Sequence, residues 1–128
     1  MEIDLPEVLA EVRAAFERYE RALVGNDVAE LDALFWDDAR TIRYGGGENL
    51  YGIAEIRAFR TARSPVGLER ALANTAITTY GTDMAVASTL FRRTTVPGRV
   101  GRQMQTWMRT PEGWKVVAAH VSLIDEPK

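Results

Sequence analysis

The hydrophobic period of the sequence changes at Pro65, and this change is the strongest constraint on the fold. Before Pro65, apolar residues recur mainly every three or four positions, as they do on one face of an α-helix. After Pro65, four segments rich in β-branched and aromatic residues are separated by the turn sequences "GTD", "TVPG" and "PEG". This order predicts an α+β domain, with helices packed on one face of a curved, mostly antiparallel sheet.

Three helices and two short strands are expected before Pro65. Asp4 resembles the capping residue of a first helix, which has proline in its first turn and ends near Gly25. "DVAE", residues 27–30, resembles a capping box that opens a short second helix. "GIAEIRAFRTAR" returns to helical periodicity until Ser64 and the following proline stop it. Residues 40–51 predict two short strands around three glycines.

Composition and charge exclude several classes of function. The 128 residues, 46% hydrophobic and 27% charged, predict one globular domain over residues 1–128. A net charge of -2, spread along the chain, gives no reason to expect nucleic acid or an anionic membrane surface as a partner. No apolar run approaches the ~20 residues of a membrane span, and the N-terminus shows no secretion signal. We therefore expect a cytoplasmic protein.

The sequence lacks most of the common catalytic groups. There is no cysteine, which excludes thiol nucleophiles and thiolate metal sites. His120 is the only histidine, so a multi-histidine metal site is impossible. No G-x-S-x-G, P-loop or G-x-G-x-x-G motif is present. We expect no metal and no cofactor, and the remaining candidates for chemistry are arginine, tyrosine, carboxylate and amide groups.

The last predicted strand is apolar on both of its faces. Strict alternation gives two sets of side chains, with Trp114, Val116, Ala118 and His120 on one face and Val117, Ala119, Val121 and Leu123 on the other. An antiparallel sheet with one face in water should instead alternate apolar with polar residues. A second copy of the protein would cover the outer face, so we expect a homodimer.

Several motifs carry a resemblance to known proteins. "GNDVAELDALFWDDA" and "GWKVVAAHVS" resemble the NTF2-like superfold, also called SnoaL-like, in which three helices and a strongly curved sheet enclose a conical pocket. "FERYERAL", "LDALFWDDARTIRYGGGENLYG", "RTPEGW" and "VVAAHVSLI" resemble, more closely, the AtzH-like family, which includes the oxalurate-catabolism HpxZ proteins. This second resemblance spans essentially the whole chain.

The resemblance implies a cofactor-independent decarboxylating amidohydrolase. Its substrate would be a small carboxylated urea, 1,3-dicarboxyurea, converted to allophanate in cyanuric acid (s-triazine) catabolism. The functional tyrosine and arginine of the family correspond to Tyr19, on the apolar stripe of the first helix, and to Arg43. The shared motifs leave two alternatives open: an HpxZ-like oxalurate-catabolism protein, and a non-catalytic anion-binding accessory subunit of an amidohydrolase.

Two interpretations of Arg43 follow from the stretch "TIRYGGGENLYG". An arginine at a strand end is usually a solvated surface charge. Thr41, Arg43 and Gly45 share one face of the strand, while Ile42 and Tyr44 share the other. If the pocket lies on the Arg43 side, the guanidinium fork suits a carboxylate. If Ile42 and Tyr44 pack under the helices instead, Arg43 lies outside. The glycines are expected to form the turn between the two strands.

The remaining candidates for substrate binding are Gln105, His120, Arg102 and Asn49. Gln103 and Gln105 share a strand face and need hydrogen-bond partners if they are buried, which a urea-like ligand would provide. His120 could act as a general acid or base, although a lone histidine on an apolar face is more often structural. Arg102 points away from Gln103 and suits either an anion or a dimer salt bridge. Asn49 suits a ligand or simple solvation at a loop tip.

Overall fold

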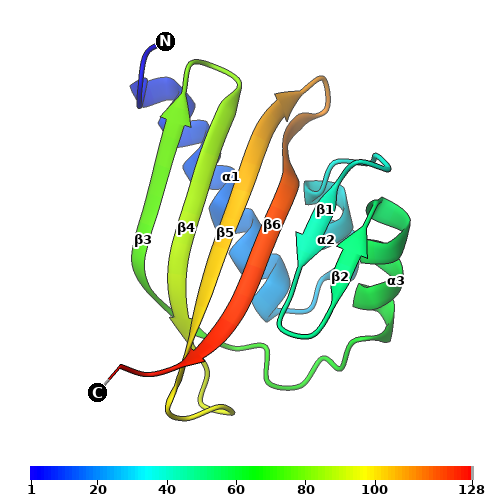
Figure 1. Ribbon diagram of the computed structural model, residues 1–128. Coiled ribbons are helices and arrows are strands. Elements are labelled where there is room, and N and C mark those ends of the chain that lie inside the picture. The colour runs from blue at the N-terminus through cyan, green and yellow to red at the C-terminus, as the bar shows by residue number, and fades with distance from the viewer. Residues whose placement is uncertain (128) are drawn as a thin grey trace.

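Three helices lie against one face of a six-stranded sheet in the computed structural model, which describes residues 1–127 (Figure 1). The helices are α1 (Pro6–Val24), α2 (Val28–Leu34) and α3 (Ile53–Ala62). The strands are β1 (Ile42–Tyr44), β2 (Asn49–Tyr51), β3 (Ala71–Tyr80), β4 (Met84–Arg92), β5 (Arg99–Thr110) and β6 (Gly113–Asp125). The strand order is β2-β1-β6-β5-β4-β3, and every pair is antiparallel except β1 with β6. The predicted α+β architecture, with a mostly antiparallel sheet, is confirmed.

The helix α1 runs behind the long strands and fills the core with its apolar stripe (Figure 1). The buried side chains of this stripe follow three- and four-residue spacing: Val8, Val12, Ala15, Phe16, Tyr19, Ala22 and Leu23. They share one core with sheet residues that include Ala85, Ala87, Trp107 and Val116. We call this helix-covered side of the sheet the inner face. No helix of the described chain covers the opposite side, the outer face (Figure 1).

Asp4 does not cap α1, contrary to the expectation from sequence. The N-cap residue is Leu5, which makes no side-chain capping hydrogen bond. Asp4 adopts a φ of 57°, and its backbone N–H donates to the carbonyl of Thr79 at 3.1 Å. Its carboxylate accepts a hydrogen bond from the Thr79 N–H at 2.9 Å. Asp4 therefore ties the N-terminal segment to β3, using the left-handed backbone that a short polar residue tolerates.

One extra residue in β6 forms a β-bulge. Thr106 of β5 pairs with Ala118, whereas the next residue, Trp107, pairs with Val116. Val117 is therefore left between them, and the strict alternation of side chains along β6 is broken at this point. A bulge of this kind also increases the local twist of the sheet, in keeping with its curvature.

The bulge overturns the predicted faces of β6. Trp114 and Val116, before the bulge, are buried against the core. Beyond it, Ala119 pairs with Gln105, whose side chain is buried on the inner face, so Ala119 shares that face. His120 is exposed and lies on the outer face. The prediction that His120 shares a face with Trp114 and Val116 is wrong, because it assumed unbroken alternation.

Phe91 of β4 lies directly across from Gly101 of β5. The Phe91 side chain is fully buried, and a Cβ atom at position 101 would lie 2.1 Å from its ring. That distance is far inside van der Waals contact, and the ring is rigid. Gly101 therefore provides the room in which Phe91 lies flat on the inner face.

We expect Gly101→Ala to lower the free energy of unfolding by about 1–3 kcal/mol, because the added methyl group displaces the ring of Phe91. Urea denaturation measures this difference. Gly46→Ala is the matched control, since nothing lies within 4 Å of a Cβ atom there. Its effect should stay within about 0.5 kcal/mol. Equal stability of the two variants would contradict the packing role of Gly101.

Candidate functional site

A cavity of about 370 Å³ opens between the inner face of the sheet, α3 and the segments that follow α3 and β4. Its polar lining includes three arginines, Arg43, Arg63 and Arg93, and no carboxylate from the described residues. Its apolar lining includes Phe59 and Phe91. Two larger depressions, of about 560 and 490 Å³, lie outside the helices and are lined mostly by exposed or half-exposed residues. The smaller cavity is the better candidate, because positive charge converges in it within a protein of net charge -2.

The strand β1 turns Arg43 into this cavity. Arg43 is 9% exposed, and its guanidinium lies 5.3 Å from the centre of the Phe59 ring. Its Nη1 donates to Oε1 of Glu48 at 2.8 Å, which leaves its other donors available to a ligand. The neighbouring Ile42 and Tyr44 face the depression on the outer face. Of the two interpretations drawn from sequence, the structure therefore has Arg43 on the pocket side.

The glycines after β1 let Glu48 fold back onto Arg43. The N–H of Gly45 donates to the carbonyl of Glu48 at 2.9 Å, which closes the turn. A Cβ atom at position 45 would lie 1.8 Å from Oε1 of Glu48. Only glycine therefore leaves room for the ion pair in its present geometry, and Glu48 is part of the site rather than a solvated loop tip.

Tyr19 reaches the same region from α1. Its side chain is 4% exposed, and its ring centre lies 6.2 Å from that of Phe35. The pKa values of Arg60, Arg63 and Arg93 are all lowered, chiefly because burial disfavours the charged guanidinium. Interaction with Tyr19 opposes this lowering in each case.

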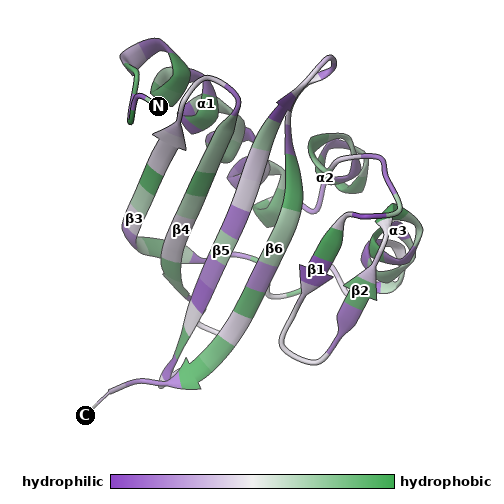
Figure 2. Ribbon diagram, turned by 45° about the horizontal axis from the view of Figure 1, so that its top comes forward, coloured by the Kyte–Doolittle hydropathy of each residue, from purple (hydrophilic) through white to green (hydrophobic). Residues whose placement is uncertain are grey.

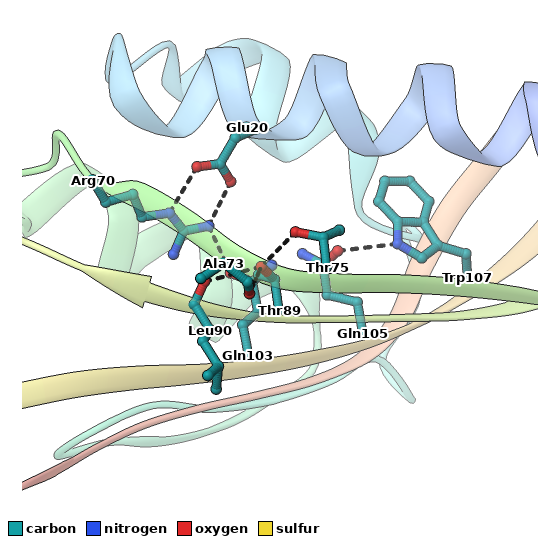
Figure 3. Close-up of polar contacts among 9 residues, drawn as sticks. All are labelled: Glu20, Arg70, Ala73, Thr75, Thr89, Leu90, Gln103, Gln105 and Trp107. Carbon is teal, nitrogen blue, oxygen red and sulfur yellow. Dashed lines mark hydrogen bonds and ion pairs between the residues drawn. The ribbon is translucent and has the colours of Figure 1, made fainter. Parts of the chain in front are cut away.

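Two inner arginines are held by carboxylates. Nη1 of Arg60, which is 2% exposed, donates to Oδ1 of Asp32 at 2.7 Å. Arg70 holds Glu20 of α1 with two hydrogen bonds, from Nε at 2.8 Å and from Nη2 at 2.5 Å (Figure 3). Such two-pronged pairs fix the orientation of both partners. These ion pairs join the end of α3 to α2 and the start of β3 to α1, so they have a structural role.

Arg63 and Arg93 differ, because neither has a carboxylate partner within residues 1–127. Arg63 directly follows α3, and Arg93 directly follows β4. Nε and Nη2 of Arg63 and Nε of Arg93 are shielded from water and lack hydrogen-bond partners. The guanidinium of Arg93 lies 4.7 Å from the centre of the Phe91 ring. The sequence analysis did not single out either residue, since locally each resembles a surface arginine at the end of an element.

The inner face of β5 carries two buried glutamines between the sheet and α1 (Figure 3). Gln103 and Gln105 are each 1% exposed. Oε1 of Gln103 accepts from Nη2 of Arg70 at 2.9 Å, and Oε1 of Gln105 accepts from Nε1 of Trp107 at 3.1 Å. The Nε2 group of each glutamine is buried without a hydrogen-bond partner, and neither residue lines the cavity.

None of the four residues predicted to bind substrate lines the cavity, and this corrects the expectation from sequence. Gln105 is buried on the inner face outside the lining, and the other three lie further away. His120 and Arg102 are exposed on the outer face, where His120 meets the edge of the Tyr44 ring and Nε of Arg102 donates to Oγ of Ser122 at 3.2 Å. The bulge at Val117 turns His120 outward. Asn49 is exposed at the start of β2. We therefore leave these four residues out of the site.

Metal-binding groups are not clustered in the described part of the chain. Within residues 1–127, no three His, Cys, Asp or Glu side chains are placed to hold a metal ion. No helix in this range is both long and apolar enough to cross a membrane. The cavity offers guanidinium groups, which suit carboxylates.

Solved structures share this arrangement. A protein of unknown function from Pectobacterium atrosepticum, of the DUF3225 family, is 67% identical, with a TM-score of 0.94 over 96% of this chain and 95% of that chain. A cystatin-like fold protein from Burkholderia xenovorans is 51% identical, with a TM-score of 0.95 over 99% of each chain. An NTF2-like protein of unknown function from Pseudomonas putida is 19% identical, with a TM-score of 0.78 over 95% of this chain and 96% of that chain, and supports the fold alone. No curated protein matches the chain significantly in sequence.

The NTF2-like fold that the sequence motifs predicted is confirmed by these neighbours. The AtzH-like family profile matches residues 1–127, which is nearly the full length of the chain. The match includes the segments that carry Tyr19 and Arg43. The chain belongs to the AtzH-like family.

Proposed function

We propose that the cavity binds a small carboxylated urea and removes one of its N-carboxy groups. The observation that carries this proposal is the placement of Arg43, a buried guanidinium in a cavity lined by three arginines and, among described residues, no carboxylate. A guanidinium fork binds a carboxylate with two parallel hydrogen bonds. Membership in the AtzH-like family favours 1,3-dicarboxyurea as the substrate and allophanate as the product.

In this reaction the bond between one urea nitrogen and its carboxyl carbon breaks. Carbon dioxide leaves, the electron pair stays on nitrogen, and that nitrogen takes up one proton to give allophanate. Negative charge develops on the nitrogen and, by resonance, on the urea oxygen. Arg43 would stabilise this charge, because a fixed and largely buried positive group acts more strongly than one in bulk solvent.

Tyr19 would position the substrate and supply the proton. Interaction with Tyr19 opposes the lowering of the pKa values of Arg60, Arg63 and Arg93, so we propose that its hydroxyl faces the bound anion. A positioned side chain that transfers a proton contributes typically about 10²–10⁴-fold to a rate. Gln105 does not line the cavity, so we assign it no contact with the substrate.

Product analysis tests the proposal directly. The purified protein is incubated with 1,3-dicarboxyurea and, separately, with oxalurate, and carbon dioxide and ammonia are followed over time. Carbon dioxide release from 1,3-dicarboxyurea above the spontaneous rate supports the proposal. Turnover of oxalurate alone would favour an oxalurate-catabolism protein. Binding of either compound without turnover would favour an accessory subunit.

We expect Arg43→Lys to reduce kcat/KM for 1,3-dicarboxyurea by about 10²-fold or more, because lysine keeps the charge but loses the planar fork. The melting temperature should fall by only a few degrees, about the effect of 1 kcal/mol. Arg102→Lys, on the outer face, is the control and should keep full activity. Full activity in Arg43→Lys would contradict two-pronged binding of the substrate carboxylate by Arg43.

Tyr19→Phe should lower kcat by about 10²-fold or more if the hydroxyl supplies the proton. The ring remains, so its packing against Phe35 should persist and stability should change little. Steady-state kinetics distinguish a proton donor from a group that only binds substrate. Loss of a hydroxyl that binds the ground state and the transition state equally would raise KM and leave kcat unchanged. Unchanged kcat would therefore remove Tyr19 as the proton donor.

We also propose that a second copy of the chain covers the outer face. A depression of about 350 Å³ there is lined by Ile42, Val86, Ala118 and Met104, among others, and Met104 is 55% exposed. Figure 2 shows hydrophobic stretches along β4 and β6, and no helix within residues 1–127 covers the outer face of these strands. Exposed apolar patches of this kind mark interaction sites, and a homodimer is the commonest solution.

Met104→Glu should shift the protein toward monomer, because it would bury two carboxylates near the centre of the interface. Size-exclusion chromatography with light scattering measures the mass. Val24→Glu, at the end of α1 and also partly exposed, is the control and should keep the native mass. A dimer that survives Met104→Glu with unchanged affinity would argue against this surface.

A further inference from the structure

The protein itself does not balance the positive charge of the cavity. Each of three inner arginines has a carboxylate partner: Arg43 with Glu48, Arg60 with Asp32, and Arg70 with Glu20. Arg63 and Arg93 have none within residues 1–127, and no acidic residue of that range lines the cavity. Parts of both guanidinium groups are buried, and burying charge without a protein partner is unfavourable, so an anion bound here would be stabilising.

The donors of Arg63 that lack a partner are the same two atoms with which Arg70 binds a carboxylate. Arg70 donates hydrogen bonds to the carboxylate of Glu20 from Nε and Nη2, at 2.8 and 2.5 Å (Figure 3). The same two nitrogen atoms of Arg63 are buried and have no partner. Arg93 adds a third buried donor, its Nε, and the Phe91 ring beneath it holds it at the cavity wall. Together these two arginines place three hydrogen-bond donors without protein partners at the cavity wall.

The surrounding charges also favour an anion at this point. Burial lowers the pKa of Arg93, and the positive charges of Arg70 and Arg63 lower it further, although Glu20 and Tyr19 oppose this change. Burial likewise lowers the pKa of Arg63, where Tyr19 and Glu48 oppose the repulsion from Arg43 and Arg60. An anion among these groups would relieve both the repulsion and the loss of solvation.

We propose that Arg63 and Arg93 form a second carboxylate subsite, so that the cavity selects a small dianion with one carboxylate at Arg43 and the other at the Arg63–Arg93 pair. This inference rests on the proposed function and deepens it, because it fixes the charge of the substrate. The two residues are specificity-determining groups, distinct from Tyr19 and Arg43 in the reaction.

The charge of the substrate separates the two candidates that the family leaves open. The compound 1,3-dicarboxyurea carries a carboxylate at each end, whereas oxalurate carries one carboxylate and ends in an uncharged amide. Oxalurate would leave one of the two subsites without an anion. We therefore expect 1,3-dicarboxyurea to be preferred. Its product, allophanate, has lost one carboxylate and one set of contacts, which favours product release.

Binding of glutarate tests the subsite without turnover. Glutarate separates its carboxylates by the same number of chain atoms as 1,3-dicarboxyurea, and butyrate is glutarate with one carboxylate replaced by hydrogen. Isothermal titration calorimetry should show that the native protein binds glutarate about ten-fold or more tightly than butyrate. Arg63→Gln and Arg93→Gln should each weaken glutarate binding by about ten-fold, with butyrate changing much less. Arg102→Gln is the matched control and should bind both anions like the native protein.

Thermal unfolding provides the control for folding. Arg63→Gln and Arg93→Gln should leave the melting temperature equal or higher, because each removes a half-buried charge that has no carboxylate partner. Saturating glutarate should raise the melting temperature of the native protein more than that of either variant.

Equal glutarate affinity in the native protein and both variants would overturn the second subsite. Failure of the native protein to distinguish glutarate from butyrate would do the same. Neither result touches the proposed function, which carbon dioxide release from 1,3-dicarboxyurea decides separately.

Discussion

The burial of guanidinium groups is the constraint around which the inside of this protein is organised. Five arginines reach the space between the sheet and the helices, and three carboxylates face them: Arg43, Arg60, Arg63, Arg70 and Arg93 against Glu20, Asp32 and Glu48. Aromatic rings add cation–π contacts to these groups. Phe91 lies beneath the guanidinium groups of Arg70 and Arg93, and Phe35 lies beneath that of Arg60. The charge that remains uncompensated is concentrated at one cavity, where a bound anion would complete the balance.

Local backbone features deliver these side chains to the cavity. The glycine turn after β1 brings Glu48 back onto Arg43, which both orients the guanidinium and leaves part of it free. Gly101 lets Phe91 lie flat, and Phe91 in turn supports Arg93. The bulge at Val117 returns small and aliphatic side chains to the inner face of β6 and sends His120 outward. Positions far from one another in sequence thus determine where the positive charge is held.

The fold could be predicted from sequence because hydrophobic periodicity, turn residues and the stop at Pro65 all act locally. Arg43 could be assigned to one face of a short strand for the same reason, since alternation over three residues leaves little room for error. Alternation failed for His120, because no residue near Val117 signals the bulge. Arg63 and Arg93 could not be found at all. Their role depends on the folded chain, which brings the end of α3 and the end of β4 to one cavity. It also depends on the lack of a carboxylate partner for either residue within residues 1–127.

The central claim is that the arginine-lined cavity binds the carboxylates of the substrate. A crystal structure of the protein with bound glutarate tests it most directly. The prediction is one carboxylate in contact with Arg43 and the other in contact with Arg63 and Arg93. Glutarate bound only elsewhere, with Arg43 still contacted by Glu48 alone and no carboxylate in the cavity, would contradict the claim.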